Sequence, residues 1–378
     1  MAKLGEVCKV SPSTKNIERQ GAWLLNLDMV EQQTGRVIEY KYVGEDDLNG
    51  SIIQFDTENV LYSKLRPNLN KVVLPPKDGF STSELLPLRP DASVLNKDYL
   101  AAFLRSDSFV TWAVSKTAGA KMPRLGTKDL MNAEIPVPSI EQQKKIAEKF
   151  KKLEQLISLR KQQLAKLDEL VKARFVEMFG DEQAFNKEPL SQNVEEMFIG
   201  PFGSSLKNEN FVSKENGYCM VYEQKHAIRK TMDVETRYID KPKYEELKRF
   251  SIHGGDIIVS CRGTIGETYI VPLNAPLGIM HPSIMKIRVK DSIYDRVFFD
   301  FLLQEKLKQH EAQANGSGVK MAVTASALGK EEFIVPSIPF QNQFAAFVER
   351  VDQQKQTVQQ SLEKLELMKK ALMQEYFG

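Results

Sequence analysis

The sequence predicts an α+β fold built from two copies of one unit, each a β-rich α/β domain followed by a long helix. The first observation is a repeat: residues 137–180 recur without gaps at residues 335–378, and 16 of the 44 paired positions are identical. Ordinary residue frequencies would give about three identities by chance. The second and third observations are a helical pattern in both copies and strand patterns in both preceding segments. A period of 198 residues, from Val137 to Val335, is too long for a solenoid and predicts approximate two-fold symmetry.

The two β-rich domains are predicted at residues 1–140 and 181–338. Short runs of β-branched and aromatic residues predict their strands, and each domain also carries one helical stretch. The predicted strands include Ser51–Phe55, Asn59–Tyr62, Lys71–Leu74, Asp256–Ser260 and Thr268–Pro272, and the predicted helices are Lys97–Ser115 and Ser292–Glu311.

The two domains agree at framework positions and differ at their loop tips. A shared scaffold that carries different loops is typical of two binding domains with different targets. The matching framework pairs are Ser63 with Ser260, Gly79 with Gly278, and Met122 with Met321.

Two long helices are predicted at residues 141–180 and 339–378. No proline or glycine falls between Glu141 and Phe179, or between Phe340 and Phe377. Apolar residues recur at heptad spacing over about five heptads in each helix, which predicts a coiled-coil seam. The seam residues that we expect to pack are Phe150, Leu153, Ile157, Leu164 and Leu167 in the first helix and Val348, Val351, Leu362 and Leu365 in the second.

Each seam is interrupted by basic residues at complementary positions. Arg160 and Arg174 interrupt the first helix, and Lys355 and Lys369 interrupt the second. Long basic side chains can extend out of an apolar seam towards water. Polar seam residues can also specify which helices pair. Both interpretations remain open from the sequence.

Composition is ordinary for a soluble protein, with 42% hydrophobic and 27% charged residues. A net charge of +2 argues against a basic nucleic-acid coat protein, although local basic patches remain compatible with nucleic-acid binding. No apolar run approaches the length of a membrane span, and the first residues do not resemble a signal peptide. Three cysteines without a CxxC pair fit a reducing compartment. We therefore expect a cytoplasmic protein that does not associate with a membrane.

No catalytic motif is recognisable in the sequence. There is no GxxxxGK[ST] phosphate loop, no GxSxG elbow, and no GxGxxG fingerprint after a strand. The histidines and cysteines match no zinc spacing. We therefore predict no catalytic residues, no metal site and no cofactor bound by this chain.

Loops rich in Arg, Lys, Asn, Ser and Gly follow strands in both domains. Arginine reads guanine edges and Asn or Gln reads adenine, while Lys, Ser and backbone N–H groups hold phosphates. These loops predict contact with DNA. The candidate residues are Lys64, Arg66, Asn68, Asn70, Lys71, Lys121 and Arg124 in the first domain and Ser204, Ser205, Lys207, Lys225, Arg229, Arg262 and Lys320 in the second.

The arrangement resembles the specificity subunit of type I restriction-modification systems. The resemblance covers essentially the whole chain and departs mildly where Pro339-Phe340 replaces the Glu-Gln of the first copy. The segments that carry it are IPVPSIEQQKKIA (135–147), VPSIPFQNQFA (335–345), GPFGSSLK (200–207), YSKLRP (62–67) and SCRGTIG (260–266).

The resemblance implies two target recognition domains, related by a pseudo-two-fold repeat and separated by two long antiparallel coiled-coil helices. Each domain would read one half of an asymmetric, bipartite sequence in double-stranded DNA. The helices would act as a spacer and as a docking surface for two methyltransferase subunits. Restriction subunits would complete the complex, and S-adenosylmethionine, ATP and Mg would bind to the partners, so this chain itself would not be an enzyme.

Two other classes of function remain open. One is a coiled-coil protein-interaction scaffold without sequence-specific DNA binding, which a salt-dependent gel shift would distinguish because phosphate contacts weaken with salt. The other is an enzyme with an unrecognised site, which methylase activity of the purified chain alone would support.

Overall fold

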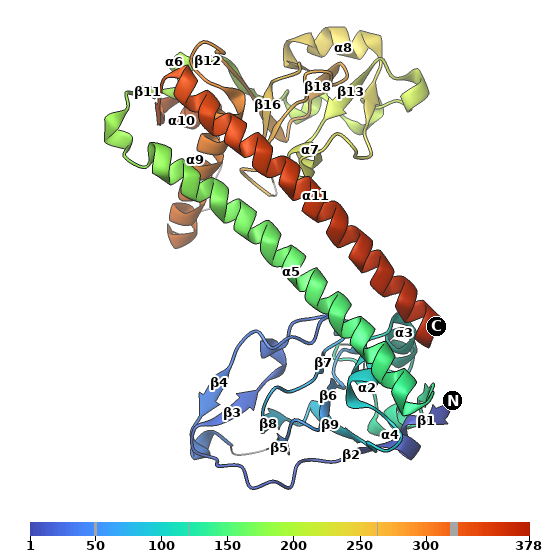
Figure 1. The fold of residues 1–378 in the computed structure, drawn as a ribbon. Helices are drawn as coiled ribbons and strands as arrows, with labels where there is room; N and C mark the ends of the chain where they lie inside the picture. The colour runs from blue at the N-terminus through green and yellow to red at the C-terminus, as the bar shows by residue number, and fades with distance from the viewer. Residues whose placement is uncertain (49–50, 120, 263, 318–323) are drawn as a thin grey trace. The chain divides into compact units, whose positions relative to one another are not determined.

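The computed structural model describes the backbone of residues 1–48, 51–119, 121–262, 264–317 and 324–378, and their side chains except those of residues 310–317. The chain divides into two compact units. Unit 1 contains residues 1–164 and 357–378, and unit 2 contains residues 165–356. Each unit therefore holds one β-rich domain together with part of both long helices, so the units differ from the four segments that the sequence suggests (Figure 1).

Unit 1 contains two four-stranded sheets and one strand pair. The first sheet is antiparallel, in the order β2 (Cys8–Val10), β9 (Leu85–Pro90), β6 (Val60–Ser63), β7 (Val72–Val73). The second has the order β4 (Lys41–Val43), β3 (Ala22–Leu25), β8 (Gly79–Thr82), β5 (Ile52–Phe55), with β3 and β8 parallel. Strand β1 (Ala2–Lys3) pairs with β10 (Glu134–Ile135).

Unit 2 repeats this topology strand for strand. Its antiparallel sheet has the order β12 (Val194–Ile199), β19 (Ile284–Val289), β16 (Ile257–Ser260), β17 (Thr268–Ile270). Its second sheet has the order β14 (Tyr238–Ile239), β13 (Cys219–Tyr222), β18 (Gly278–Met280), β15 (Ser251–Ile252), and β13 and β18 form the parallel pair. Strand β11 (Lys187–Pro189) pairs with β20 (Glu332–Ile334). The structure thus confirms the predicted α+β class and shows that the domains are two copies of one scaffold.

Two equivalent glycines show how closely the copies agree. A Cβ on Gly79 would lie 2.8 Å from the Trp23 carbonyl oxygen, and one on Gly278 would lie 2.6 Å from that of Met220. Both glycines therefore allow the parallel strand pair to approach closely, at the same place in each unit.

The predicted helix over residues 97–115 is two helices, α2 (Lys97–Leu104) and α3 (Asp107–Ser115). The break lies at Ser106, whose hydroxyl accepts a hydrogen bond from the Phe109 N–H and so caps α3. In unit 2 the corresponding stretch is one helix, α9 (Arg296–Ser317).

The shorter helices are α1 (Leu4–Val7), α4 (Thr127–Met131), α6 (Leu190–Asn193), α7 (Gln224–Arg229), α8 (Lys241–Leu247) and α10 (Ala325–Lys330). The 3-10 turns are η1 (Leu27–Met29), η2 (Glu45–Leu48), η3 (Pro67–Leu69), η4 (Glu182–Ala184), η5 (Gly203–Ser205), η6 (Asn208–Asn210), η7 (Lys214–Asn216) and η8 (Lys248–Phe250).

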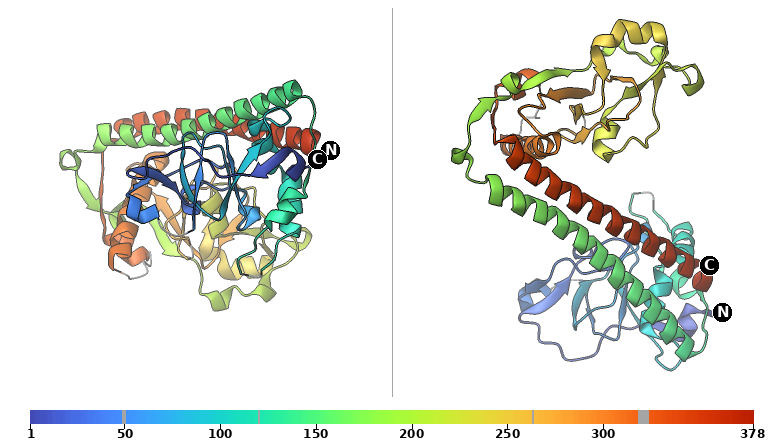
Figure 2. Two further views of the ribbon diagram at one scale, coloured as in Figure 1. Left: turned by 90° about the horizontal axis from the view of Figure 1, so that it is seen from below. Right: turned by 45° about the horizontal axis from the view of Figure 1, so that its top comes forward.

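The two long helices, α5 (Ile140–Phe179) and α11 (Ile338–Phe377), pair antiparallel within each unit (Figure 2). In unit 1 the Lys149 ammonium donates to the Tyr376 hydroxyl at 2.8 Å, and Lys369 pairs with Glu154 at 2.9 Å. In unit 2 the Lys355 ammonium lies 2.6 Å from Asp168. The pairing runs in opposite directions along the two helices, as predicted.

The nine predicted seam residues are all shielded from solvent at least in part. The buried ones are Phe150, Leu153, Leu167, Val351 and Leu362, and the half-buried ones are Ile157, Leu164, Val348 and Leu365.

Three of the four basic interruptions bond across the helix pair. Arg160 donates to Ser361 at 3.2 Å, Lys355 pairs with Asp168, and Lys369 pairs with Glu154. The fourth, Arg174, places its guanidinium over the Phe347 ring. These side chains therefore reach polar or aromatic partners on the other helix rather than water alone.

Each long helix ends in an aromatic core. In unit 1, Phe377 at the end of α11 packs against Tyr99, Phe103 and Phe150, with ring centroids 5.3–5.8 Å apart. In unit 2, the end of α5 is buried in the same way. There Phe179 lies among aromatic rings that include Phe298 and Phe340. A helix that begins in one unit therefore completes the hydrophobic core of the other. None of the described helices is both long and apolar enough to cross a membrane.

Candidate nucleic-acid interface

In unit 1 two of the predicted DNA-binding loops meet. Residues 121–124 lie along one side of the turn that joins β6 to β7, which comprises residues 64–70. The Arg66 N–H donates to the Pro123 carbonyl at 2.8 Å, and Leu65 and Arg124 form an isolated β-bridge. The Arg124 guanidinium also pairs with Glu84 at 3.1 Å. These backbone bonds fix the two loops against each other.

A third loop, residues 31–36, joins them, and the sequence reasoning did not single it out. The backbone N–H of Gln33 donates to the Leu69 carbonyl at 3.1 Å, and its side-chain Nε2 donates to the Asn68 carbonyl at 3.1 Å. We refer to residues 31–36, 64–70 and 121–124 as the first loop cluster. The repeat could have identified this loop, because the matching segment of unit 2 contains residues that the sequence predicts to contact DNA.

The backbone of this cluster adopts an unusual conformation. Gln33, Arg66 and Asn70 all have positive φ, at 64°, 49° and 49°. Among the described residues, Lys230 in unit 2 is the other non-glycine residue with positive φ, at 49°. Such residues cost free energy and persist where surrounding contacts impose them, often at functional sites. The concentration of three in one cluster marks it as a candidate interface.

The exposed candidates of unit 1 are Arg66, Asn68, Lys121 and Arg124, and Lys64 is half-buried. Two candidates have structural roles instead. Asn70 is 6% exposed and its Nδ2 donates to the Arg105 carbonyl at 3.0 Å. The Lys71 ammonium donates to the Leu27 carbonyl at 2.5 Å, and burial lowers its pKa. The Asn70 Nδ2 and the Lys71 ammonium already bind the protein, so we do not expect these two side chains to contact DNA.

Arg105 ties the first loop cluster to both long helices. Its Nη2 donates to the Val72 carbonyl at 2.7 Å, and its Nη1 lies 3.3 Å from the Glu154 carboxylate of α5. Glu154 in turn pairs with Lys369 of α11 at 2.9 Å. Burial lowers the pKa of the Arg105 guanidinium, and the Glu154 charge opposes this shift. Because guanidinium groups keep their proton in proteins, Arg105 stays charged and holds the end of the turn in place.

In unit 2 the corresponding elements are α7 and the turn between β16 and β17. Helix α7 packs against both strands. Lys225 on α7 pairs with Glu223 at 2.8 Å, and Glu223 also binds Arg237. Arg229 at the end of α7 and Arg262 after β16 are exposed. Lys320 lies outside the described residues.

The segment at residues 200–207 approaches the same region. A Cβ on Gly200 would collide with the His281 carbonyl, and the His281 N–H donates to the Tyr222 carbonyl, just before α7. Ser204 and Lys207 are exposed, and Ser205 is half-buried. We refer to residues 200–207, 223–230 and 260–262 as the second loop cluster.

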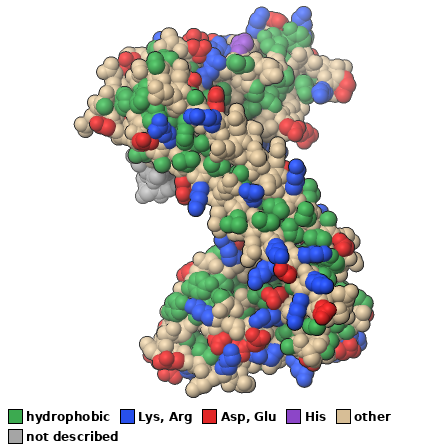
Figure 3. Space-filling view, viewed as in Figure 1, with side chains coloured by type: hydrophobic (Ala, Val, Ile, Leu, Met, Phe, Trp, Pro, Cys, Tyr) green, Lys and Arg blue, Asp and Glu red, His purple; other side chains and the backbone are tan. Residues whose placement is uncertain are grey.

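His226 of the second loop cluster and the adjacent His281 carry little positive charge at neutral pH. Burial lowers the pKa of both His226 and His281 from its usual range. The positive charge of this cluster therefore comes from its lysines and arginines. In the view of Figure 3, basic and acidic side chains are interspersed over both units, with no continuous basic surface.

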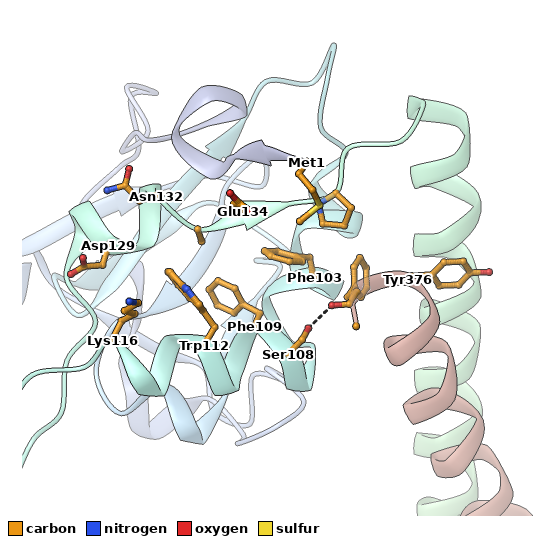
Figure 4. Close-up of a pocket in the computed structure, with 14 residues that line it drawn as sticks. Met1, Phe103, Ser108, Phe109, Trp112, Lys116, Asp129, Asn132, Glu134 and Tyr376 are labelled. Carbon is orange, nitrogen blue, oxygen red and sulfur yellow. Dashed lines mark hydrogen bonds between the residues drawn. The ribbon is translucent and has the colours of Figure 1, made fainter.

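The described residues contain a pocket of about 600 Å³ in unit 1 (Figure 4). It lies where α11 ends, and the Ser108 hydroxyl donates to the Phe377 carbonyl there at 2.6 Å. Its lining includes Phe103, Phe109 and Trp112, and no predicted DNA-binding residue. Within the described part of the chain, no group of three His, Cys, Asp or Glu side chains is placed to hold a metal ion.

The chain is therefore a duplicated scaffold that carries two different loop clusters, one in each unit. The type I restriction modification DNA specificity domain family matches residues 1–169 and 204–367, which is most of the chain. The chain belongs to this family, which confirms the resemblance seen in its sequence.

Individual relatives agree with this assignment. The type I restriction enzyme EcoDI specificity subunit of Escherichia coli is 27% identical over 124 residues, which is 33% of this chain and 27% of that protein. The matched stretch is therefore about a quarter of the length of that relative. The chain also matches a solved structure from work on the complex assembly and conformational transition of the type I R-M system. That match has a TM-score of 0.62 and 17% identity, and covers 100% of this chain and 96% of the other.

The S subunit of the type I restriction-modification system from M. genitalium matches with a TM-score of 0.54 and 16% identity, over 100% of this chain and 95% of that one. At these identities the two structural matches show a common fold.

Proposed function

We propose that this chain is the non-catalytic DNA specificity subunit of a type I restriction-modification complex, in which each unit reads one half of a bipartite, asymmetric target. The observation that carries the proposal is the contrast between scaffold and loops. The two units share strand order and pairing, whereas the first loop cluster presents Arg66, Asn68 and Arg124 and the second presents Arg229 and Arg262.

The exposed groups have the chemistry that base recognition needs. Arginine forms bidentate hydrogen bonds with guanine, and side-chain amides form them with adenine. Lysine, serine and backbone N–H groups bind phosphates and set the position of the protein on the duplex. In this proposal Lys64, Lys121, Ser204 and Lys207 hold the backbone, and the arginines and amides read bases. The different side chains of the two clusters predict two unlike half-sites.

The partners in this proposal are double-stranded DNA, two methyltransferase subunits and restriction subunits. The repeated helices give two similar surfaces, which suits two copies of one partner. S-adenosylmethionine, ATP and Mg would bind to those subunits, and the complex would act in the cytoplasm.

Two measurements test the proposal. A gel shift of the chain with its methyltransferase subunit should show affinity for DNA that falls steeply as salt rises, because phosphate contacts release counterions. Methylome sequencing of cells with and without the gene should return a methylated sequence in two unlike halves with a gap. A protein-interaction scaffold predicts instead no sequence-specific shift and no new methylated motif, and a palindromic motif would contradict the asymmetric target.

A further inference from the structure

The loop after β3 and the segment after β13 are equivalent positions in the two units. The backbone carbonyl oxygen of Trp23 in β3 lies against Gly79 of β8. In the same way, that of Met220 in β13 lies against Gly278 of β18. Ten residues further along the chain lie Gln33 and Lys230. Both are exposed, and both have positive φ, at 64° and 49°. The repeat therefore places one left-handed residue at the equivalent chain position of each unit, and in unit 1 this residue contacts the turn between β6 and β7.

The Gln33 amide is held in a defined orientation within the first loop cluster. Its Nε2 donates one hydrogen to the Asn68 carbonyl at 3.1 Å. A primary amide has two N–H groups and a carbonyl oxygen, so one N–H and Oε1 remain without a described partner. This free pair matches the N7 acceptor and N6 donor that adenine presents in the major groove.

We propose that Gln33 is a specificity-determining residue that reads an adenine in the half-site of unit 1. This inference rests on the proposed function, because it assumes that the first loop cluster faces DNA. The neighbours of Gln33 support it, since Arg66 and Asn68 are exposed on the adjoining turn.

The backbone at Gln33 argues for a role of the side chain. Glycine adopts positive φ without steric cost, and glutamine does not. The same loop uses glycine two residues later, at Gly35, which has φ 67° and faces the Val72 carbonyl with no room for a Cβ. A purely structural turn would be served by glycine at both positions. Glutamine at position 33 therefore carries a cost that a contact made by its amide explains.

The test uses the full chain expressed with its methyltransferase subunit in a host without DNA methylation, followed by methylome sequencing. Gln33→Gly removes the amide and keeps the left-handed backbone. Lys230→Gly makes the same backbone change at the equivalent position of unit 2. Gln20→Ala removes an exposed amide at the opposite end of β3 and serves as the baseline.

Gln33→Gly should reduce discrimination at one adenine of one half-site by roughly 5- to 150-fold, the range of a lost bidentate contact. The other half-site and the gap should stay unchanged. Lys230→Gly and Gln20→Ala should leave the half-site of unit 1 as it is in the wild type.

Two outcomes overturn the inference while the proposed function stands: Gln33→Gly retains both half-sites at wild-type discrimination, or it degrades both half-sites together. A wild-type complex that yields no methylated motif overturns the proposed function, and the inference with it. Gln33→Glu gives a second readout, because a carboxylate cannot donate to N7 and should favour cytosine, whose N4 group donates.

Discussion

Gln143 shows how a single residue joins a domain to its helix. It is fully buried near the start of α5, where its Nε2 donates to the Val94 and Pro138 carbonyls at 2.8 Å and its Oε1 accepts from the Asn96 N–H at 2.9 Å.

In unit 2 the residue at the matching position of the repeat, Gln341, makes the same set of bonds. Its Nε2 donates to the Ile293 and Pro336 carbonyls at 2.8 Å, and its Oε1 accepts from the Asp295 N–H at 2.9 Å. The glutamine shared by the two repeat copies is therefore a buried connector that joins each domain to the start of its long helix. The sequence alone does not predict this role, because glutamine is usually exposed.

Gln143→Ala should lower the free energy of unfolding of unit 1 by about 3 kcal/mol, because it leaves three buried polar groups without partners. Tryptophan fluorescence during urea unfolding reports on this unit, since both tryptophans, Trp23 and Trp112, belong to it. Lys144→Ala, the next and exposed position, should change stability by less than about 0.5 kcal/mol. Equal stability of the two variants would show that the connector is dispensable.

Asp300 makes the stability of unit 2 depend on pH. It lies on α9, where the Gln304 amide donates to its carboxylate at 2.7 Å, and burial raises its pKa above the ordinary value of 3.8. In the window between the ordinary and the raised pKa, the folded chain keeps a proton that the unfolded chain has released. Stability is therefore greatest below the ordinary pKa and falls as pH rises through the folded one.

Asp300→Asn should raise the melting temperature of unit 2 at neutral pH, because the amide carries no charge to bury. The gain should shrink in more acidic buffer, as pH falls through the raised pKa of the wild-type carboxyl. Calorimetry of the full chain at the two pH values measures the difference. A gain that is the same at both pH values would contradict the assignment of the effect to the ionised carboxylate.

At the scale of elements, local pattern predicted the long helices well. The absence of proline and glycine and the heptad spacing are properties of consecutive residues, and α5 and α11 follow them closely. Strands β5, β6 and β16 likewise fall on predicted runs. The break between α2 and α3 was missed because Ser106 acts as a cap only where the chain turns, and no proline or glycine signals that turn.

Phe377→Ala tests whether the end of α11 is part of the core of unit 1. The ring is 6% exposed and packs on three other aromatic rings, so its loss should cost about 3–5 kcal/mol of unfolding free energy. Tryptophan fluorescence again gives the readout. Leu367→Ala, at a site that is 67% exposed on the same helix, is the control and should have little effect. A Phe377 variant as stable as this control would show that the end of the helix is not part of the core.

At the scale of the whole molecule, each unit is built from segments far apart in the chain. Unit 1 needs residues 357–378 as well as residues 1–164, so its core closes only when α11 is present. Unit 2 has the same topology, and its aromatic core likewise includes a residue of a long helix, Phe179 of α5. Both long helices therefore contribute residues to both units.

Inserting one heptad into both helices where the two units join, after Leu164 in α5 and after Gln356 in α11, should preserve the contacts within each unit. Seven helical residues add about 10 Å, the length of about three base pairs. If the helices act as a spacer, the methylated motif should gain that gap and keep both half-sites. Methylome sequencing measures it, and a motif with its original gap would exclude the spacer role. An insertion into α5 alone should abolish methylation, because the seams no longer align.

The candidate site was only partly predictable from the sequence. Arg66, Asn68 and Arg229 were identified by residue type and are exposed. Asn70 has the same residue type as Asn68, yet its amide is buried against Arg105. Gln33 was missed because it lies more than thirty residues before the turn that it contacts.

The sequence by itself determined that this protein is a duplicated unit with two long helices and a family likeness. Repeats, heptads and motifs consist of residues near one another in the chain, so they can be recognised without a fold. Only the tertiary structure decided which loops meet, which candidates are buried, and which core each helix end completes. Those features depend on contacts between distant residues, which form when strands pair and helices pack and which no local pattern specifies.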